Sequence, residues 1–210
     1  MTDAAVIVYH RNATRIYERR WLDRCVASIE AQTMADFDIL EVDYGGDAER
    51  LFPSSRFASQ RLPTFADAAN VLLDRCVAQG YEVMFNVHVD DFYAPERFAA
   101  EVAAIDAGAD LVSTDFAVVD ADDQVLWTHD FHDLDIASEF ANGHNIMCHP
   151  SVAYTARFWR GCSRYRPDEI PREDFTLWQR ELGRWGFQII GPVLTFCRDH
   201  PNRTSNSDNR

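Results

Sequence analysis

Two adjacent carboxylates at the end of a predicted strand are the residues best placed to do chemistry in this sequence. Residues 81–87 are typical of a buried strand, and His88-Val89-Asp90-Asp91 follows directly. In open α/β sheets the ligand crevice lies beyond the carboxyl ends of the strands. Asp90 and Asp91 would there offer oxygen ligands to Mg²⁺ or Mn²⁺ and, through the ion, bind a diphosphate. The same carboxylates would equally suit the cap of a helix predicted to begin at Pro95, and the sequence leaves both interpretations open.

Two further acidic positions have a functional and a structural interpretation. Asp43 closes an earlier predicted strand, just before Gly45-Gly46. A carboxylate there could bind a ribose or a base, with the glycines allowing a ligand close to the backbone, although the residues alone favour an ordinary turn. Glu173 and Asp174 begin a predicted helix, where acidic residues stabilise the helix dipole without any catalytic role.

Other sequence patterns argue against a second acidic metal motif and against several other classes of enzyme. Residues 120–123 match the pattern D-x-D more closely, but they lie between two short predicted strands, where aspartates form solvated turns. His129 and His132 lie in a predicted loop without the HExxH frame of a zinc hydrolase. The sequence contains no GxGxxG, P-loop lysine or GxSxG elbow, which argues against dinucleotide enzymes, P-loop NTPases and serine hydrolases.

The elements that would position these residues alternate between strand and helix in the first half of the chain. The patterns predict strands at 4–9, 38–43, 81–87 and 110–119, and helices at 14–32, 66–79 and 95–107. Strand, helix and strand within forty residues indicate a parallel βαβ unit. The sequence therefore predicts an α/β, Rossmann-like sheet with its carboxyl-end edge as the site.

The alternation ends after residue 119. The sequence predicts a hairpin around 120–123, a loop-rich stretch at 130–141, a strand at 151–154, a helix at 173–185 and final strands at 187–190 and 193–196. No low-complexity linker divides the chain. We therefore expect one domain over residues 1–200 and a flexible polar tail over 201–210.

Composition limits the partners. The 210 residues carry 20 basic and 34 acidic side chains, a formal net charge of −14, so nucleic acid and anionic membrane surfaces are poor partners. No apolar run has the length of a transmembrane segment, and the N-terminus lacks the basic region of a signal peptide. Five widely spaced cysteines without a CxxC pair suggest buried free thiols, and together these features lead us to expect a cytoplasmic protein.

The order of the motifs resembles the family 2 glycosyltransferases of the GT-A fold. The resemblance spans residues 4–200 and includes Ser28–Thr33 as an S-x-x-x-Q-T helix end, Asp38–Asp47 as the E-I-x-V-D-D-G-S-x-D strand, Ala68-Ala69-Asn70 as A-x-N, Val89-Asp90-Asp91 as the metal motif, Glu173-Asp174 as E-D and Arg198-Asp199-His200 as R-x-H. Each motif is weak alone, but their shared order is specific. The resemblance implies a single GT-A domain with a mixed, mostly parallel sheet flanked by helices.

The resemblance also implies a function and its residues. It implies a metal-dependent, inverting glycosyltransferase that moves one hexose from a nucleotide-sugar donor, preferably a UDP-sugar, to a hydroxyl of a glycan, lipid-linked or protein acceptor. Asp174 would be the general base, with Glu173 beside it. The donor would be bound by His10, Arg11, Asn12, Asp43, Asn70 and Asp90; Mn²⁺ or Mg²⁺ by Asp90, Asp91 and His200; and the acceptor by His144, Asn145, His149, Trp159 and Trp178.

The sequence departs from the family pattern at two positions and leaves two other functions open. His88 occupies the place of the first acid of D-x-D, and Tyr44 a place where an acid is frequent. The short chain favours transfer of one sugar over processive synthesis. A GT-A-like nucleotidyltransferase is the first alternative, although Tyr9–Asn12 lack its glycines. A sugar-nucleotide-binding module without turnover is the second, and His88 is the residue that favours it.

Overall fold

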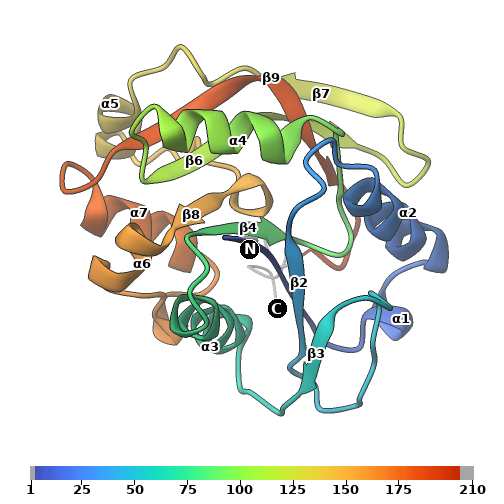
Figure 1. Ribbon diagram of the computed structural model, residues 1–210. Coiled ribbons are helices and arrows are strands. Elements are labelled where there is room, and N and C mark those ends of the chain that lie inside the picture. Colours follow the sequence, from blue (N-terminus) through green and yellow to red (C-terminus); the bar gives the residue numbers. More distant parts are fainter. Residues whose placement is uncertain (1–2, 204–210) are drawn as a thin grey trace.

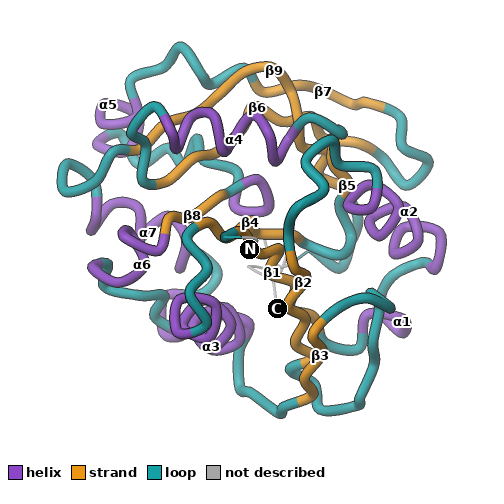
Figure 2. Tube along the Cα trace, in the orientation of Figure 1, coloured by secondary structure: helices purple, strands orange, loops and turns teal. Residues whose placement is uncertain are grey.

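The apolar run near the start of the chain forms the strand β1 (Ala4–His10), buried along its whole length. The computed structural model describes residues 3–203. Within them one sheet has the strand order β3-β2-β1-β4-β8-β6-β9-β5, and β7 pairs with β6 at its side (Figures 1 and 2). The remaining strands are β2 (Asp38–Asp43), β3 (Arg56–Ser59), β4 (Val83–Val87), β5 (Phe92–Tyr93), β6 (Leu111–Val119), β7 (Val125–His129), β8 (Ala153–Thr155) and β9 (Phe187–Arg198).

The strand directions confirm the expected mixed, mostly parallel sheet. The strands β3, β2, β1 and β4 pair in parallel, and so do β6 and β9. The short strand β8 lies antiparallel between β4 and β6, so that both parallel groups run the same way. Their carboxyl ends therefore meet at one edge of the sheet, where the sequence predicts the site.

Helices cover both faces of this sheet (Figure 1). They are α1 (Ala13–Ile16), α2 (Arg19–Glu30), α3 (Phe65–Ala78), α4 (Arg97–Asp106), α5 (Ile136–Ala141), α6 (Ala156–Gly161) and α7 (Glu173–Glu181), with the 3-10 turns η1 (His149–Ser151) and η2 (Pro167–Glu169). Alternate residues of β1 enter two cores, as the period of two in a strand requires. Ile7 packs in the core that contains α3, α6 and α7, whereas Val6 and Val8 pack in the core that contains α2 and α4.

Two predicted helices differ from the structure. The helix expected over 14–32 is broken into α1 and α2, because Tyr17 is extended and its ring packs against His200 at 5.4 Å. The helix expected over 173–185 ends at Glu181. The carboxylate of Glu181 accepts hydrogen bonds from Arg184 and Trp185, which lie in the turn that follows.

The strands also differ in three places. The two final strands are one bulged strand, β9, whose register against β6 shifts opposite Thr114 and Asp115, around Gly191-Pro192. Strands β3 and β5 and the helix α6 were not predicted from the sequence.

No helix within residues 3–203 has both the length and the apolar character needed to cross a bilayer. Of the expected tail, 201–203 form a turn, and 204–210 lie outside the described residues.

Candidate functional site

A cavity of about 440 Å³ opens at the carboxyl ends of the parallel strands. Its wall comes from segments far apart in the sequence: the ends of β1, β2 and β4, the loop before η1, the start of α7 and the end of β9. The lining includes Tyr9, His10, Arg11, Tyr17, Tyr44, His88, Asp90, Asp91, Asn145, Cys148, His149, Glu173, Asp174, Cys197, Asn202 and Arg203. The cavity thus brings the two predicted acidic pairs together.

His88, Asp90 and Asp91 form a compact group at the end of β4. One ligand atom from each lies within 4.8 Å of the others, and this is the group of His, Cys, Asp and Glu side chains in the described residues that has metal-ligand spacing. Neither aspartate caps α4, because the residue before that helix is Glu96 and it makes no side-chain cap. The capping interpretation of this motif is therefore wrong.

The two aspartates are held by β9 and the turn after it. The backbone N–H of Arg198 donates to Asp91 Oδ1 at 2.8 Å, and His200 Nε2 lies 3.0 Å from Asp90 Oδ2. Burial raises the pKa of both carboxyls, but the hydrogen bond with His200 leaves the pKa of Asp90 lowered overall. Burial and the neighbouring charge of Asp90 raise the pKa of Asp91 well above its usual value.

His88 is a neutral nitrogen donor beside these carboxylates. Burial lowers the pKa of its imidazole to about 3, with a smaller contribution from His149, whose ring meets it edge-on at 5.0 Å. Its backbone N–H donates to Tyr93 Oη at 2.8 Å, which fixes the turn. Its buried Nε2 has no hydrogen-bond partner among residues 3–203. An unpaired buried nitrogen costs free energy unless another ligand satisfies it.

This donor set fits a divalent cation. Two ligands of one Mg²⁺ or Mn²⁺ ion lie at most about 4.2 Å apart, twice the usual bond length of about 2.1 Å. The observed limit of 4.8 Å is therefore only slightly wider than a closed site. Carboxylates suit Mg²⁺ and Mn²⁺, whereas an imidazole ligand favours transition metals over Mg²⁺.

Glu173 and Asp174 line the same cavity from the first turn of α7. Asp174 Oδ2 accepts from the side-chain amide of Asn145 at 3.2 Å, and Oδ1 accepts from the N–H of Phe175 at 2.6 Å. Burial raises the pKa of Asp174 in spite of these bonds. Burial and the charge of Asp174 raise the pKa of Glu173 to about 7, and its Oε2 has no partner among the described residues. The N-terminus of α7 therefore does not bring the pKa of either carboxyl below its ordinary value.

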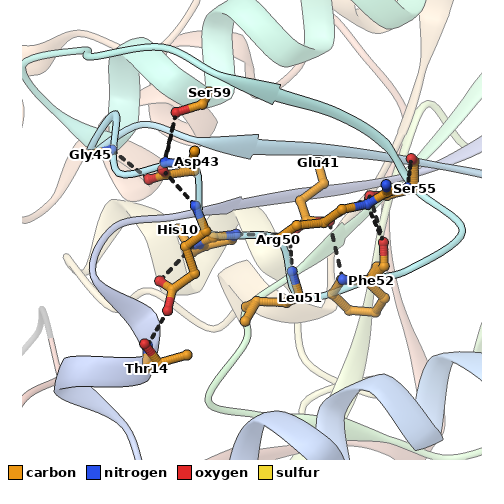
Figure 3. A network of polar contacts seen from close by, with 12 residues as sticks. His10, Thr14, Glu41, Asp43, Gly45, Arg50, Leu51, Phe52, Ser55 and Ser59 are labelled. Carbon is orange, nitrogen blue, oxygen red and sulfur yellow. Dashed lines mark hydrogen bonds and ion pairs between the residues drawn. The ribbon is translucent and has the colours of Figure 1, made fainter.

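A buried polar network fixes the strand ends next to the cavity (Figure 3). His10 Nε2 lies 2.9 Å from Glu41 Oε1, and both side chains are buried. The carboxylate of Glu41 also accepts from the N–H of Leu51 at 2.6 Å and from Ser55 Oγ at 2.6 Å. This network ties the loop after β2 to the end of β1, so that the ring of His10 reaches the cavity wall with little freedom.

Asp43 belongs to the same supporting structure. Its oxygens accept from the N–H groups of Gly45 at 2.9 Å and Glu49 at 3.3 Å and from Ser59 Oγ at 3.2 Å. The side chain is fully buried and is not part of the cavity lining. Asp43 therefore shapes the turn before β3, and a direct contact with a nucleotide stays a prediction.

Arg11 joins the cavity to a second, shallower hollow. The guanidinium of Arg11 stacks on the ring of Tyr44 at 4.5 Å, and both residues line the cavity. The second hollow is lined by Arg11, Asn12, Arg15, Gly45, Asp47, Arg61, Leu62 and Pro63. Of the residues predicted to bind the nucleotide-sugar donor, Arg11 and Asn12 thus lie together beyond the end of β1.

Besides Asp43 and Asn12, four more predicted site residues lie outside the cavity lining. Asn70 bridges α3 to Tyr165 through two hydrogen bonds, and Trp178 is fully buried in the core. His144 is exposed and pairs with Glu139 at 2.8 Å. The ring of His200 contacts Asp90, which lines the cavity, but His200 itself does not line it. Of the other acceptor candidates, Trp159 is buried and donates to Asp74 at 2.8 Å, whereas His149 lines the cavity.

Several lining residues were missed because their spacing forms no motif. Tyr17, Cys148, Cys197 and Asn202 come from a helix break, a loop, a strand and the last turn, and only the tertiary fold brings them together. Tyr44 was not predicted to bind a ligand either, but it follows Asp43 directly and has a signal in the sequence, as a departure from the family pattern. The acidic string 120–123 is a turn, as predicted: Asp120 Oδ1 accepts from the N–H groups of Asp122 and Gln124.

Comparison with known proteins supplies structural matches alone. No protein-family model and no curated protein sequence matches the chain. The crystal structure of S. aureus TarS 1-349 in complex with UDP-GlcNAc matches with a TM-score of 0.72 over 97% of this chain, at 13% sequence identity. The structure of the same protein in complex with UDP matches with a TM-score of 0.68 over 94% of the chain, at 14% identity.

The chain spans about three fifths of the length of these TarS 1-349 structures, 60% and 61%. At this identity the match concerns the arrangement of strands and helices. The chain therefore has the α/β fold seen in S. aureus TarS, and the GT-A architecture implied by the order of its sequence motifs is confirmed.

Proposed function

We propose that this chain is a glycosyltransferase that moves one sugar from a UDP-sugar to an acceptor hydroxyl. The observation that carries the proposal is the position of two acidic pairs, Asp90–Asp91 and Glu173–Asp174, in one cavity at the carboxyl ends of the strands. The binding of UDP and UDP-GlcNAc by TarS, which shares the fold, supports a uridine nucleotide as the donor. Because the chain corresponds to part of those structures, its donor and acceptor are both proposals.

The donor end of the proposed site lies at β1, β2 and β4. His88, Asp90 and Asp91 would hold the divalent cation, with His200 supporting Asp90 from behind. When bound, such an ion neutralises negative charge that grows on a diphosphate leaving group. Tyr44 and Arg11 offer a stacked aromatic and guanidinium surface on the way to the second hollow, and we assign the nucleoside to this side.

Asp174 is the general base of this proposal. Burial raises the pKa of Asp174, and a raised pKa makes its carboxylate a better acceptor for the proton of an incoming hydroxyl. Asn145 orients one oxygen of Asp174 through the bond at 3.2 Å, and the cavity exposes the group to an incoming acceptor. Attack from the side opposite the leaving diphosphate would invert the anomeric centre. Glycan, lipid-linked and protein hydroxyls all fit this chemistry.

Release of UDP from UDP-GlcNAc tests the proposal. We expect the full chain with Mn²⁺ to release UDP, slowly to water and faster with an acceptor. Asp174→Asn should slow acceptor-dependent release by about 10²–10⁴-fold, the usual contribution of a general base. Asp122→Asn, in the exposed turn at 120–123, is the matched control and should keep the normal rate, because surface ion pairs contribute little.

One result would contradict the assignment of the base, and another the transferase proposal itself. If Asp174→Asn and the control variant had equal rates, Asp174 would not be the base. If UDP bound but no UDP-sugar turned over with any acceptor hydroxyl, the alternative of a binding module would replace the enzyme. The replacement of the first acid of D-x-D by His88 is the observation that favours that alternative.

A further inference from the structure

Two of the five cysteines meet in the wall of the cavity. Cys148, in the loop before η1, and Cys197, near the end of β9, have their Sγ atoms 3.2 Å apart, and both line the cavity. They are 49 residues apart in the chain. The other thiols lie elsewhere; Cys25 Sγ, for example, lies 3.5 Å from the carbonyl oxygen of His88.

The backbone holds these two sulfur atoms in contact. The N–H of Cys148 donates to Ser113 Oγ at 3.1 Å, and its carbonyl accepts from the N–H of Ser151 at 2.8 Å. Cys197 lies opposite Val118 in the parallel pairing of β9 with β6. A disulfide needs an S–S distance of about 2.05 Å, so the sulfurs must approach by a little over 1 Å. Closing this gap requires the two side chains to rotate or the loop that carries Cys148 to shift.

We propose that Cys148 and Cys197 form a reversible disulfide with hydrogen peroxide as the oxidant, and that this bond weakens ligand binding in the cavity. The sulfur of Cys148 attacks one peroxide oxygen, the O–O bond breaks and one water leaves, which gives a sulfenic acid. The sulfur of Cys197 then loses its proton and displaces the hydroxyl as a second water. Two thiols are oxidised and one peroxide is reduced to two waters.

The surroundings set the order of these steps. Cys148 is the more accessible of the pair, at 8% exposure against 2% for Cys197. The hydrogen bond with Cys148 and burial raise the pKa of Cys197 well above its usual value, so Cys197 stays a thiol until its neighbour has reacted. Because Cys197 already touches Cys148, we expect the disulfide to form before a second peroxide arrives.

Both cysteines are attached to segments that support the predicted cation group. Cys197 precedes Arg198, whose N–H donates to Asp91 Oδ1 at 2.8 Å. Cys148 precedes His149, whose ring contacts that of His88 at a centroid distance of 5.0 Å. Formation of the disulfide should therefore move the segments that contact Asp91 and His88, which are two of the three proposed metal ligands. This effect on binding rests on the proposed function, whereas formation of the disulfide does not.

Peptide mapping tests the disulfide directly. The chain contains no lysine, so trypsin cleaves after arginine alone, and each cysteine falls in its own tryptic peptide. Reduced full-length protein is treated with hydrogen peroxide, and its free thiols are counted in denaturant. We expect five thiols to become three. Peptides 98–157 and 185–198 should be joined with the loss of two hydrogen atoms and separate again with dithiothreitol. Cys148→Ser should prevent the cross-link, and Cys162→Ser, the matched buried control, should leave it intact.

The second arm measures Mn²⁺-dependent UDP binding by calorimetry before and after oxidation. We expect oxidation to weaken binding by about tenfold, the lower end of what disturbing a support of a metal ligand costs. Binding by Cys148→Ser should not change with peroxide. Five remaining thiols, a different cross-link or over-oxidation of Cys148 alone would overturn the site. A cross-link that leaves UDP binding unchanged would overturn its effect. Absence of UDP binding to the reduced protein, with the cross-link formed, would instead contradict the proposed function.

Discussion

Neighbouring carboxyls at the start of α7 meet different surroundings. Asp174 has both oxygens in hydrogen bonds, whereas Glu173 is only 3% exposed and one of its oxygens has no partner within residues 3–203. Burial first, and the charge of Asp174 second, raise the pKa of Glu173 to about 7. The folded protein therefore binds a proton at Glu173 between pH 4.5 and 7 that the unfolded chain releases.

This difference gives a stability prediction with a definite sign. Because the folded state holds more protons in that range, the contribution of Glu173 lowers the free energy of unfolding as the pH rises from 4.5 to 7. Glu173→Gln should remove this slope and stabilise the protein by about 1–3 kcal/mol above pH 7, since one pKa unit corresponds to about 1.4 kcal/mol. Urea unfolding of both proteins at several pH values measures the effect.

Glu101 provides the matched comparison. Burial raises the pKa of Glu101 to about 7 as well, but its carboxylate pairs with the buried Arg97 at 3.0 Å. Glu101→Gln should therefore destabilise the protein, because it leaves a buried guanidinium unpaired. A Glu173→Gln variant that is less stable than the wild type at pH 8 would contradict the account of this residue.

His88 gives a prediction about metal preference. Its neutral imidazole replaces an oxygen ligand, so the site should prefer Mn²⁺ over Mg²⁺ by more than an all-carboxylate site would. His88→Asp should raise the affinity for Mg²⁺ relative to Mn²⁺, measured by competition calorimetry in the presence of UDP. An unchanged ratio of the two affinities would mean that His88 is not a ligand.

The sequence predicted these residues unevenly. Asp90, Asp91, Glu173, Asp174, His10 and Arg11 were predicted and line the cavity, because each follows a strand or begins a helix with a clear pattern. Asn70 and Trp178 also belong to motifs, but their side chains pack inward. A motif fixes the position of a residue along an element, whereas the direction of its side chain depends on tertiary packing that no local pattern encodes.

At the scale of elements, the start of α3 shows how the chain ends one segment and begins another. Thr64 Oγ1 accepts from the N–H of Asp67 and the Asp67 carboxylate accepts from the N–H of Thr64, both at 3.1 Å, which makes a capping box. Phe65, the first residue of the helix, lines the cavity. The cap therefore holds the helix and one side of the cavity in place.

The loss of this cap should be measurable. Thr64→Ala should lower the free energy of unfolding by about 1 kcal/mol, the usual value of such a cap, whereas Thr64→Ser keeps the hydroxyl and should cost much less. Chemical denaturation of the two variants provides the comparison. Equal stability of Thr64→Ala and the wild type would show that the box contributes nothing in this context.

Long elements with regular periodicity were predicted well, and short ones were not. The continuous apolar run of β1 and the helical spacing of α3 are visible without any partner. Strand β5 has two residues and exists because Phe92 and Tyr93 pair with β9. The break between α1 and α2 likewise depends on His200, which lies far along the chain. Such features come from contacts distant in sequence, so a local pattern does not contain them.

At the scale of the whole molecule, charge constrains the proposed function. The chain carries 34 acidic residues against 20 basic ones, and the candidate site itself contains two acidic pairs. A diphosphate would be repelled from such a cavity unless a cation reversed the local charge.

The order of strands and motifs predicted the fold of the whole molecule, because connections between neighbouring parallel strands allow few topologies.

The central claim is therefore that a divalent cation and a uridine nucleotide bind together in this cavity. Calorimetric titration of the full chain with UDP, in Mn²⁺ and in EDTA, tests it most directly. The account predicts binding in Mn²⁺, loss of that binding in EDTA or in Asp91→Ala, and retention in the Asp122→Asn control. UDP binding of equal strength in Mn²⁺ and EDTA, or no binding under either condition, would contradict it.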